Sequence, residues 1–471
     1  MTMWEPIKPS CGTTPSESFL AHLCSKTFLR LWSWPNLYRD QRSSPTSRIG
    51  KELCDLLVVC DNHLIIFSDK SCKFKESGKL DTDWCRWYKK SIRDSANQIK
   101  GAERWLRDFP NQIFIDEQCQ QQFPFKLQPW DQFSVHRIVV SLNAADRCRA
   151  EIGGTGSLLI NPNIVGDDHI KPKNEYYQPF SVGWINPELG YIHVLDDITL
   201  EIVLTALDTV TDFIDYLEKK EAYITSGKLH WASGEEDLLA IYLNNVNELG
   251  KHDFPKLESR QRLVVEEGSW SALCANPHYQ DKCIADQDSV IWDLIIEEFS
   301  RHVFEATLLT DGSSNIQDHE LALGIMAKEC RVVRRSLGRE IISKIHRVHP
   351  DDIGVICMQS PNQPEVGYIY LLYPFNESID HDQYREHRKL YLSDCCNVYA
   401  WKQQHIKQII GIATETGLGN SGRSHDLLYF EPGEWTPDKE LNAKGIQKTR
   451  GLFVEGKVTK RESLEAEYPT R

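Results

Sequence analysis

An aspartate and a lysine stand at the two ends of a strongly apolar segment. The segment, residues 51–71, reads "KELCDLLVVCDNHLIIFSDKS", with Asp55 early in its first apolar run and Lys70 closing the second. A carboxylate can bind a divalent cation, and a nearby ammonium group can orient a water molecule and offset charge on a phosphate. If folding brings these side chains together, their chemistry suits hydrolysis of a phosphodiester.

A β-hairpin would bring them together. The two runs are apolar on both faces, which is typical of interior strands in a sheet covered on both sides, and Asp61-Asn62 can form a tight two-residue turn. Such a turn places Asp55 opposite Ser68. Lys70 lies on the same face within diagonal reach, whereas Asp69 points to the other face.

Flanking elements must hold this hairpin in place. Residues 15–32 form an apolar stripe opened by Thr14, Pro15 and Glu17, which predicts a helix with a capping box. A long helical pattern covers 81–109, a buried strand covers 136–142, and a further strand could lie between Trp34 and Arg48. The expected order is therefore helix, hairpin, helix, strand.

This arrangement resembles the PD-(D/E)xK nuclease-like superfamily, including its Mrr-like and nuclease-related domains, over roughly residues 14–145. The family core is helix, three strands, helix, strand. Its motif is an acid on one strand, an acid-x-Lys on the partner strand, and often a Glu on the first helix. Asp55, Lys70 and Glu17 match these positions. The resemblance implies an α/β fold with a restriction-endonuclease-like core at the N-terminus, followed by helical and α+β parts.

The resemblance also implies a metal-dependent nuclease. Mg²⁺ or Mn²⁺ would be held by Asp55, helped by Glu17 and the backbone carbonyl of Asp69, while Lys70 orients the attacking water. Gln98, on the second helix, could point at the same site. DNA is the expected substrate, RNA stays open, and a role in defence or repair is implied by analogy only.

One departure from the motif favours a second interpretation. The second strand carboxylate of the family falls at Ser68, a poor ligand for magnesium. Asp69 could replace it only if a bulge turned its side chain, and Glu52 has the same difficulty. The alternative is therefore a catalytically inactive nuclease-like scaffold or interaction protein. In it Asp55 and Lys70 form an ion pair, and Glu17 only complements its helix dipole.

Two other patterns could bind phosphates. Arg331, Arg335 and Arg339 recur every four residues and could follow a nucleic-acid backbone, although such stripes are more often solvated or paired with acids such as Glu320 and Glu340. "GLGNSGRS", at 417–424, has nucleotide-loop glycine spacing, but the next residues are typical of a strand rather than the helix that a dinucleotide site needs. We interpret it as a turn.

Composition sets the remaining expectations. The 471 residues carry a net charge of −14, but residues 1–150 hold 22 Lys and Arg against 17 Asp and Glu. This basic part can meet a polyanion, and the acidic remainder could engage a protein partner or a second copy of the chain. No apolar run is long enough for a membrane span, no signal peptide opens the chain, and 14 scattered cysteines favour the reducing cytoplasm.

Three regions are expected along the chain. Residues 1–185 form the nuclease-like α/β domain, 186–287 a mainly helical region, and 288–471 an α+β domain with a charged tail. Single helices are expected over 197–222 and 318–346.

Overall fold

A computed structural model describes residues 6–40, 50–306, 316–376, 378–416, 424–454 and 465–469. The chain forms two compact units, which meet in sequence at Gln280 and Asp281. The expected boundary near 287 lies close to this division. The expected boundary near 185 does not correspond to one, because residues 193–195 join the same sheet as the hairpin.

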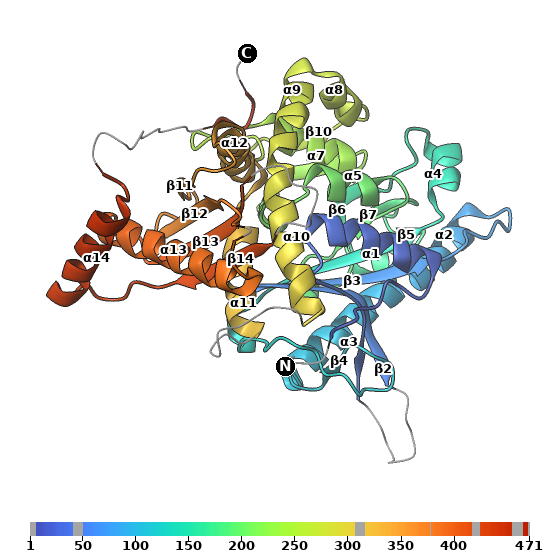
Figure 1. Cartoon of the computed structure of the whole chain (residues 1–471). Helices are drawn as coiled ribbons and strands as arrows, with labels where there is room; N and C mark the ends of the chain where they lie inside the picture. The colour runs from blue at the N-terminus through green and yellow to red at the C-terminus, as the bar shows by residue number, and fades with distance from the viewer. Residues whose placement is uncertain are drawn as a thin grey trace. The chain divides into compact units, whose positions relative to one another are not determined.

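The first unit contains a six-stranded mixed sheet in the order β4-β1-β2-β3-β5-β8 (Figure 1). Its strands are β1 (Ser33–Arg39), β2 (Lys51–Cys60), β3 (His63–Ser71), β4 (Ile113–Phe114), β5 (Ser134–Leu142) and β8 (His193–Leu195). The first three strands are antiparallel, whereas β5 is parallel to β3 and β8 is parallel to β5. The strand expected before the hairpin is confirmed as β1.

Helices cover both faces of this sheet. On one face lies α1 (Pro15–Thr27), where the Thr14 side chain accepts a hydrogen bond from the Glu17 N–H. On the other face α2 (Leu80–Tyr88), a π-helical turn η1 (Lys89–Arg93) and α3 (Asp94–Asp108) follow without interruption. Neighbouring residues of β3 reach opposite faces: Phe67 packs on Phe28 at the end of α1, and Ser68 contacts Gln98 of α3.

The rest of the first unit is built on a four-stranded sheet, β10-β9-β6-β7. Its elements are α4 (Ala145–Ile152), β6 (Leu159–Val165), β7 (Ser181–Trp184), α5 (Thr199–Ala206), α6 (Val210–Thr225), β9 (Leu229–Ala232), α7 (Glu235–Asn244), β10 (Leu263–Val265), α8 (Ser269–Ala275) and α9 (Pro277–Ala285, which runs into the second unit), with 3₁₀ turns η2 (Trp130–Gln132), η3 (Gly166–Ile170) and η4 (Pro187–Leu189). The single helix expected over 197–222 is wrong. The chain turns at Leu207, and the Thr209 side chain caps a new helix, α6, at the Asp212 N–H.

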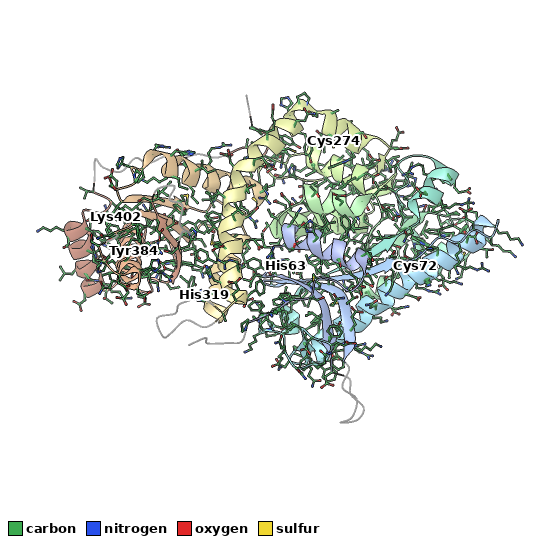
Figure 2. All side chains as sticks on the ribbon, turned by 45° about the vertical axis from the view of Figure 1, so that its right-hand side comes forward. His63, Cys72, Cys274, His319, Tyr384 and Lys402 are labelled. Carbon is green, nitrogen blue, oxygen red and sulfur yellow. The ribbon has the colours of Figure 1, made fainter. Side chains whose placement is uncertain are left out.

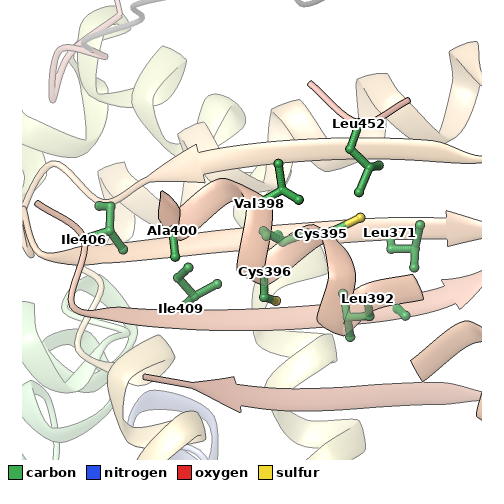
Figure 3. Close-up of a cluster of buried hydrophobic side chains, with 11 residues drawn as sticks. Leu371, Leu392, Cys395, Cys396, Val398, Ala400, Ile406, Ile409 and Leu452 are labelled. Atoms are coloured by element: carbon green, nitrogen blue, oxygen red, sulfur yellow. The ribbon is translucent and has the colours of Figure 1, made fainter. Parts of the chain in front are cut away.

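The second unit packs helices on a four-stranded sheet, β11-β12-β13-β14. Its elements are η5 (Asp286–Ser289), α10 (Val290–Phe304), α11 (Ile316–Ala327), α12 (Arg331–Arg347), β11 (Gly354–Gln359), β12 (Val366–Tyr373), α13 (His381–Lys402), β13 (Gln408–Glu415), β14 (His425–Phe430) and α14 (Pro437–Arg450). The helix expected over 318–346 is two helices, and α14 forms part of the expected tail. Figure 3 shows α13 residues such as Leu392 and Cys396 packed beside Leu371 and Ile409 of the sheet.

All 14 cysteines are free thiols. The scattered cysteines of the sequence indicated the same, since they do not suggest a disulfide framework. None of the helices within the described ranges has the length and apolar character that crossing a membrane requires.

Candidate functional site

The predicted hairpin is present with the predicted register. Paired residues run from Cys60 and His63 next to the turn to Leu56 and Phe67. Of the two turn residues, Asp61 has a positive φ of 53°. The apolar side chains of both strands are fully or almost fully buried. The two strands are therefore paired as far as Leu56, the residue that follows Asp55, and the candidate chemistry begins at Asp55.

At Asp55 the hydrogen bond between β2 and β3 is made by a side chain and not by the backbone. Its Oδ2 accepts a hydrogen bond of 2.5 Å from the Asp69 backbone N–H. Its Oδ1 lies 3.4 Å from Nε2 of Gln98, and Oε1 of Gln98 accepts a hydrogen bond of 3.1 Å from the Ser68 hydroxyl. Asp55, Ser68 and Gln98 thus share the face of the sheet that α3 covers. Burial raises the pKa of Asp55. The hydrogen bond from the Asp69 N–H and the charge of Lys70 offset part of this rise.

Asp69 points to the opposite face, toward the start of α1. The parallel register of β3 with β5 continues regularly through Asp69 and Lys70, so β3 has no bulge that would turn Asp69 around. Neither carboxylate oxygen makes a hydrogen bond to the described residues, although the Ser16 hydroxyl lies near enough to lower the pKa of Asp69. Burial dominates and, with the charges of Asp55 and Glu17, raises the pKa of Asp69 to about 6.

Glu17 and Glu52 are joined through Asn36, a link that the sequence did not indicate. The Asn36 amide donates hydrogen bonds of 2.9 Å to both carboxylates. Asn36 is fully buried and has a positive φ of 47°. Burial raises the pKa of Glu17, but hydrogen bonds from Thr13 and Asn36 outweigh it and leave the pKa lowered.

Glu52 reaches this position because the pairing of β1 with β2 is irregular. Leu37 pairs with Cys54, but the next residue, Tyr38, pairs with Glu52, so β2 contains one extra residue. Such a bulge interrupts the alternation of side chains along β2, so strict alternation no longer determines the position of Glu52. Burial raises the pKa of Glu52, and the charges of Asp55 and Glu17 raise it further.

Lys70 is the positive charge within this group of acids. Its side chain is half-buried, and its charge lowers the pKa values of Glu52, Asp55 and Asp69. The ammonium group makes no ion pair within 4 Å to any residue that the structure describes. We name the set Glu17, Glu52, Asp55, Asp69 and Lys70 the hairpin-end cluster.

The hairpin-end cluster fits a magnesium ion only in part. Oxygen ligands are available, but the carboxylates of Glu17, Asp55 and Asp69 do not form a group of three with ligand atoms all within 4.8 Å of one another. Mg²⁺ retains several waters and often uses one or two carboxylates together with substrate phosphates. Asp55 supplies one carboxylate toward that smaller requirement.

The arginine stripe does not form a phosphate-binding surface at Arg331 and Arg335. Both side chains are buried: Arg331 bonds Asp293 at 2.7 Å, and Arg335 bonds Asp286 at 3.0 Å. Arg339 is about half exposed and pairs with Asp288 at 2.9 Å. The ion-pair alternative fits these data, but the partners are acids of residues 286–293 and Glu465 instead of Glu320 and Glu340.

The glycines of "GLGNSGRS" lie outside the described residues. The strand expected immediately after them is confirmed as β14.

No protein-family model, curated protein or solved structure matches this chain.

Proposed function

We propose that the hairpin-end cluster is the active site of a divalent-metal-dependent nuclease. The supporting observation is that Asp55 and Lys70 lie on neighbouring strands at the end of a buried hairpin, close enough for the Lys70 charge to lower the pKa of Asp55. The element order α1, β1, β2, β3, α3, β5 agrees with the core of the PD-(D/E)xK superfamily. This supports the resemblance stated from the sequence.

Exposed lysines favour a polyanionic substrate at this end of β3. Lys73, Lys75 and Lys79 follow Lys70 along the chain, and all three side chains are exposed. Salt bridges within the described part of the chain engage none of them. Such a run of unpaired positive charge attracts a phosphate backbone without selecting its sequence.

Each residue then has a definite task. The Asp69 N–H and the Gln98 amide fix the orientation of the Asp55 carboxylate, which binds the cation. Bound Mg²⁺ or Mn²⁺ would polarise the phosphodiester and lower the pKa of a bound water. The Lys70 ammonium orients the attacking water and offsets negative charge that develops on the phosphate.

A second candidate, a catalytically inactive scaffold, is favoured by two observations. Ser68 replaces a family carboxylate, and its hydroxyl is engaged by Gln98. The carboxylates of the hairpin-end cluster are also dispersed over both faces of the sheet. In this case the fold would bind a partner and leave nucleic acid intact.

Plasmid cleavage separates the two candidates. The full-length chain is incubated with supercoiled DNA, and in parallel with RNA, in Mg²⁺ or Mn²⁺. Wild type is compared with Asp55→Asn, Lys70→Ala and, as a control, Lys126→Ala, whose exposed lysine lies outside the cluster. Loss of cleavage in the first two variants only, with unchanged circular dichroism, supports the nuclease. A wild type that cuts neither nucleic acid and binds neither metal refutes it.

A further inference from the structure

A second group of potential metal ligands lies at the other end of β3. His63, His136 and Glu218 each offer one ligand atom, and these atoms all lie within 4.8 Å of one another. Nδ1 of His63 is 3.1 Å from Nε2 of His136. The two imidazole rings are stacked with centroids 5.4 Å apart. Elsewhere in the described chain no other three His, Cys, Asp or Glu side chains converge in this way.

Parallel strand pairing brings the two histidines together. His136 of β5 pairs with Ile65 of β3, and His63 lies two residues before Ile65 on the same face. That face is the one covered by α1 and α6, since Phe213 of α6 packs on Phe28, which packs on Phe67. The sequence separation of 73 residues between the histidines is thus bridged by the sheet itself.

Glu218 completes the group from α6. Its side chain is exposed, whereas His136 is buried, so the group opens to solvent on the helix side. Asp215 and Glu221 lie close enough to act electrostatically on Glu218. A cation at this point would therefore enter a negatively charged surface and meet two nitrogen ligands beneath it.

The ligand types select a particular class of metal. Two imidazoles and one carboxylate suit zinc and neighbouring transition metals, whereas magnesium prefers oxygen ligands only. Zn–N bonds of about 2.0–2.1 Å in a tetrahedral site place two nitrogens roughly 3.4 Å apart, near the separation found between His63 and His136. Three protein ligands leave a fourth position for water.

We propose that His63 Nδ1, His136 Nε2 and the Glu218 carboxylate bind one Zn²⁺ ion. Bound zinc joins α6 to β3 and β5. This site is independent of the proposed nuclease activity. Lys70 lies seven positions after His63 in β3, which corresponds to roughly 23 Å along an extended strand.

Metal titration tests the proposal on the full-length chain. After chelator treatment and removal of the chelator, Zn²⁺ is titrated by calorimetry, and Co²⁺ is added as a spectroscopic probe of coordination. We expect one Zn²⁺ per chain and a Co²⁺ absorption spectrum typical of nitrogen and oxygen ligands in tetrahedral geometry. Because the cysteines are free thiols, a strong thiolate-to-cobalt band would show that Co²⁺ binds elsewhere.

Variants identify the ligands. His63→Ala and Glu218→Ala avoid the buried His136, and each should weaken Zn²⁺ binding at least about tenfold. His278→Ala, which removes an exposed histidine of the same unit, should leave it unchanged. Asp55→Asn should also leave Zn²⁺ binding unchanged, so a failed nuclease proposal and a failed zinc proposal give different results. Absence of Zn²⁺ binding, or equal binding by wild type, His63→Ala and Glu218→Ala, would overturn the assignment.

Discussion

Asp55 binds the backbone of the strand that carries Lys70: its Oδ2 accepts a hydrogen bond of 2.5 Å from the Asp69 N–H. The contact lies just beyond the last paired residues of the hairpin, Leu56 and Phe67. A side chain that could bind a cation is therefore also part of the hydrogen bonding that holds β2 and β3 together. Substitutions of Asp55 are therefore expected to change the stability of the first unit as well as any cation binding.

Replacing Asp55 by alanine should destabilise the first unit. The Asp69 N–H and the Gln98 amide would lose their acceptor while remaining buried or half-buried, at a cost of about 1–3 kcal/mol. Asp55→Asn retains one acceptor oxygen and should cost less. Urea unfolding followed by fluorescence measures the difference, with exposed Asp131→Ala as the control. Equal stability of Asp55→Ala and wild type would contradict the described hydrogen bond.

Removing the Lys70 charge should lower the rate of cleavage without unfolding the protein. The ammonium group is half-buried and makes no ion pair to the described residues, so Lys70→Met leaves no acid of a salt bridge unpaired. If Lys70 stabilises charge on the phosphate, the turnover rate should fall about 10²-fold or more. Single-turnover cleavage at saturating enzyme gives this number. An undiminished rate would exclude Lys70 from the chemistry.

Glu236 predicts a pH dependence of stability in the first unit. Burial raises its pKa from 4.5 to about 7, despite hydrogen bonds from the Ser157 and Thr155 hydroxyls. The folded state then binds this proton more tightly than the unfolded state. The contribution of Glu236 is therefore full below about pH 4.5, decreases as the pH rises toward 7, and levels off above it.

Glu236→Gln removes this titration. Each unit of pKa displacement corresponds to about 1.4 kcal/mol, so the free energies of unfolding of variant and wild type should diverge between pH 4.5 and 7. Urea unfolding at several pH values measures the divergence. A constant difference between the two proteins across this range would show that the carboxyl group does not titrate there.

Arg388 should be essential to the second unit. Its buried guanidinium donates to Asp426 through Nε at 2.7 Å and to the Ser424 carbonyl oxygen at 3.0 Å. Arg388→Met would leave the buried Asp426 carboxylate with Arg385 as its remaining arginine partner, at a cost of about 3–5 kcal/mol. Arg385 is less buried, and Arg385→Met should lower the melting temperature by less. Thermal unfolding monitored by circular dichroism compares the two variants.

The sequence predicted the hairpin well because its signals are local. Two apolar runs around Asp61-Asn62 determine the turn, and alternation along an extended strand then places Asp55, Ser68 and Lys70 on one face. Alternation does not describe Glu52 in the same way, because one extra residue in β2 shifts the pairing between Leu37 and Tyr38. A bulge of this kind depends on the neighbouring strand, which single-strand periodicity does not describe.

Other features depend on partners far away in the sequence. The spacing of Arg331 and Arg335 predicted a stripe on one helical face, but only the packed unit shows that this face meets Asp286 and Asp293. His63 and His136 belong to segments with no common motif, and their contact follows from the parallel pairing of β3 with β5. The break between α5 and α6 has a local signal, the capping residue Thr209, which a continuous apolar periodicity concealed.

Strand β3 has neighbours along both of its edges, with β5 following it from His63 to Ser71. Figure 2 marks His63 at its first residue and Cys72 just beyond its last. Hydrogen bonding to β2 and β5 fixes the register of β3, so one end of the strand does not shift along its neighbours without the other end. Pairing along both edges therefore keeps the imidazole end and the Lys70 end of β3 at a fixed separation, so a ligand at one end can be gained or lost without moving the side chains at the other.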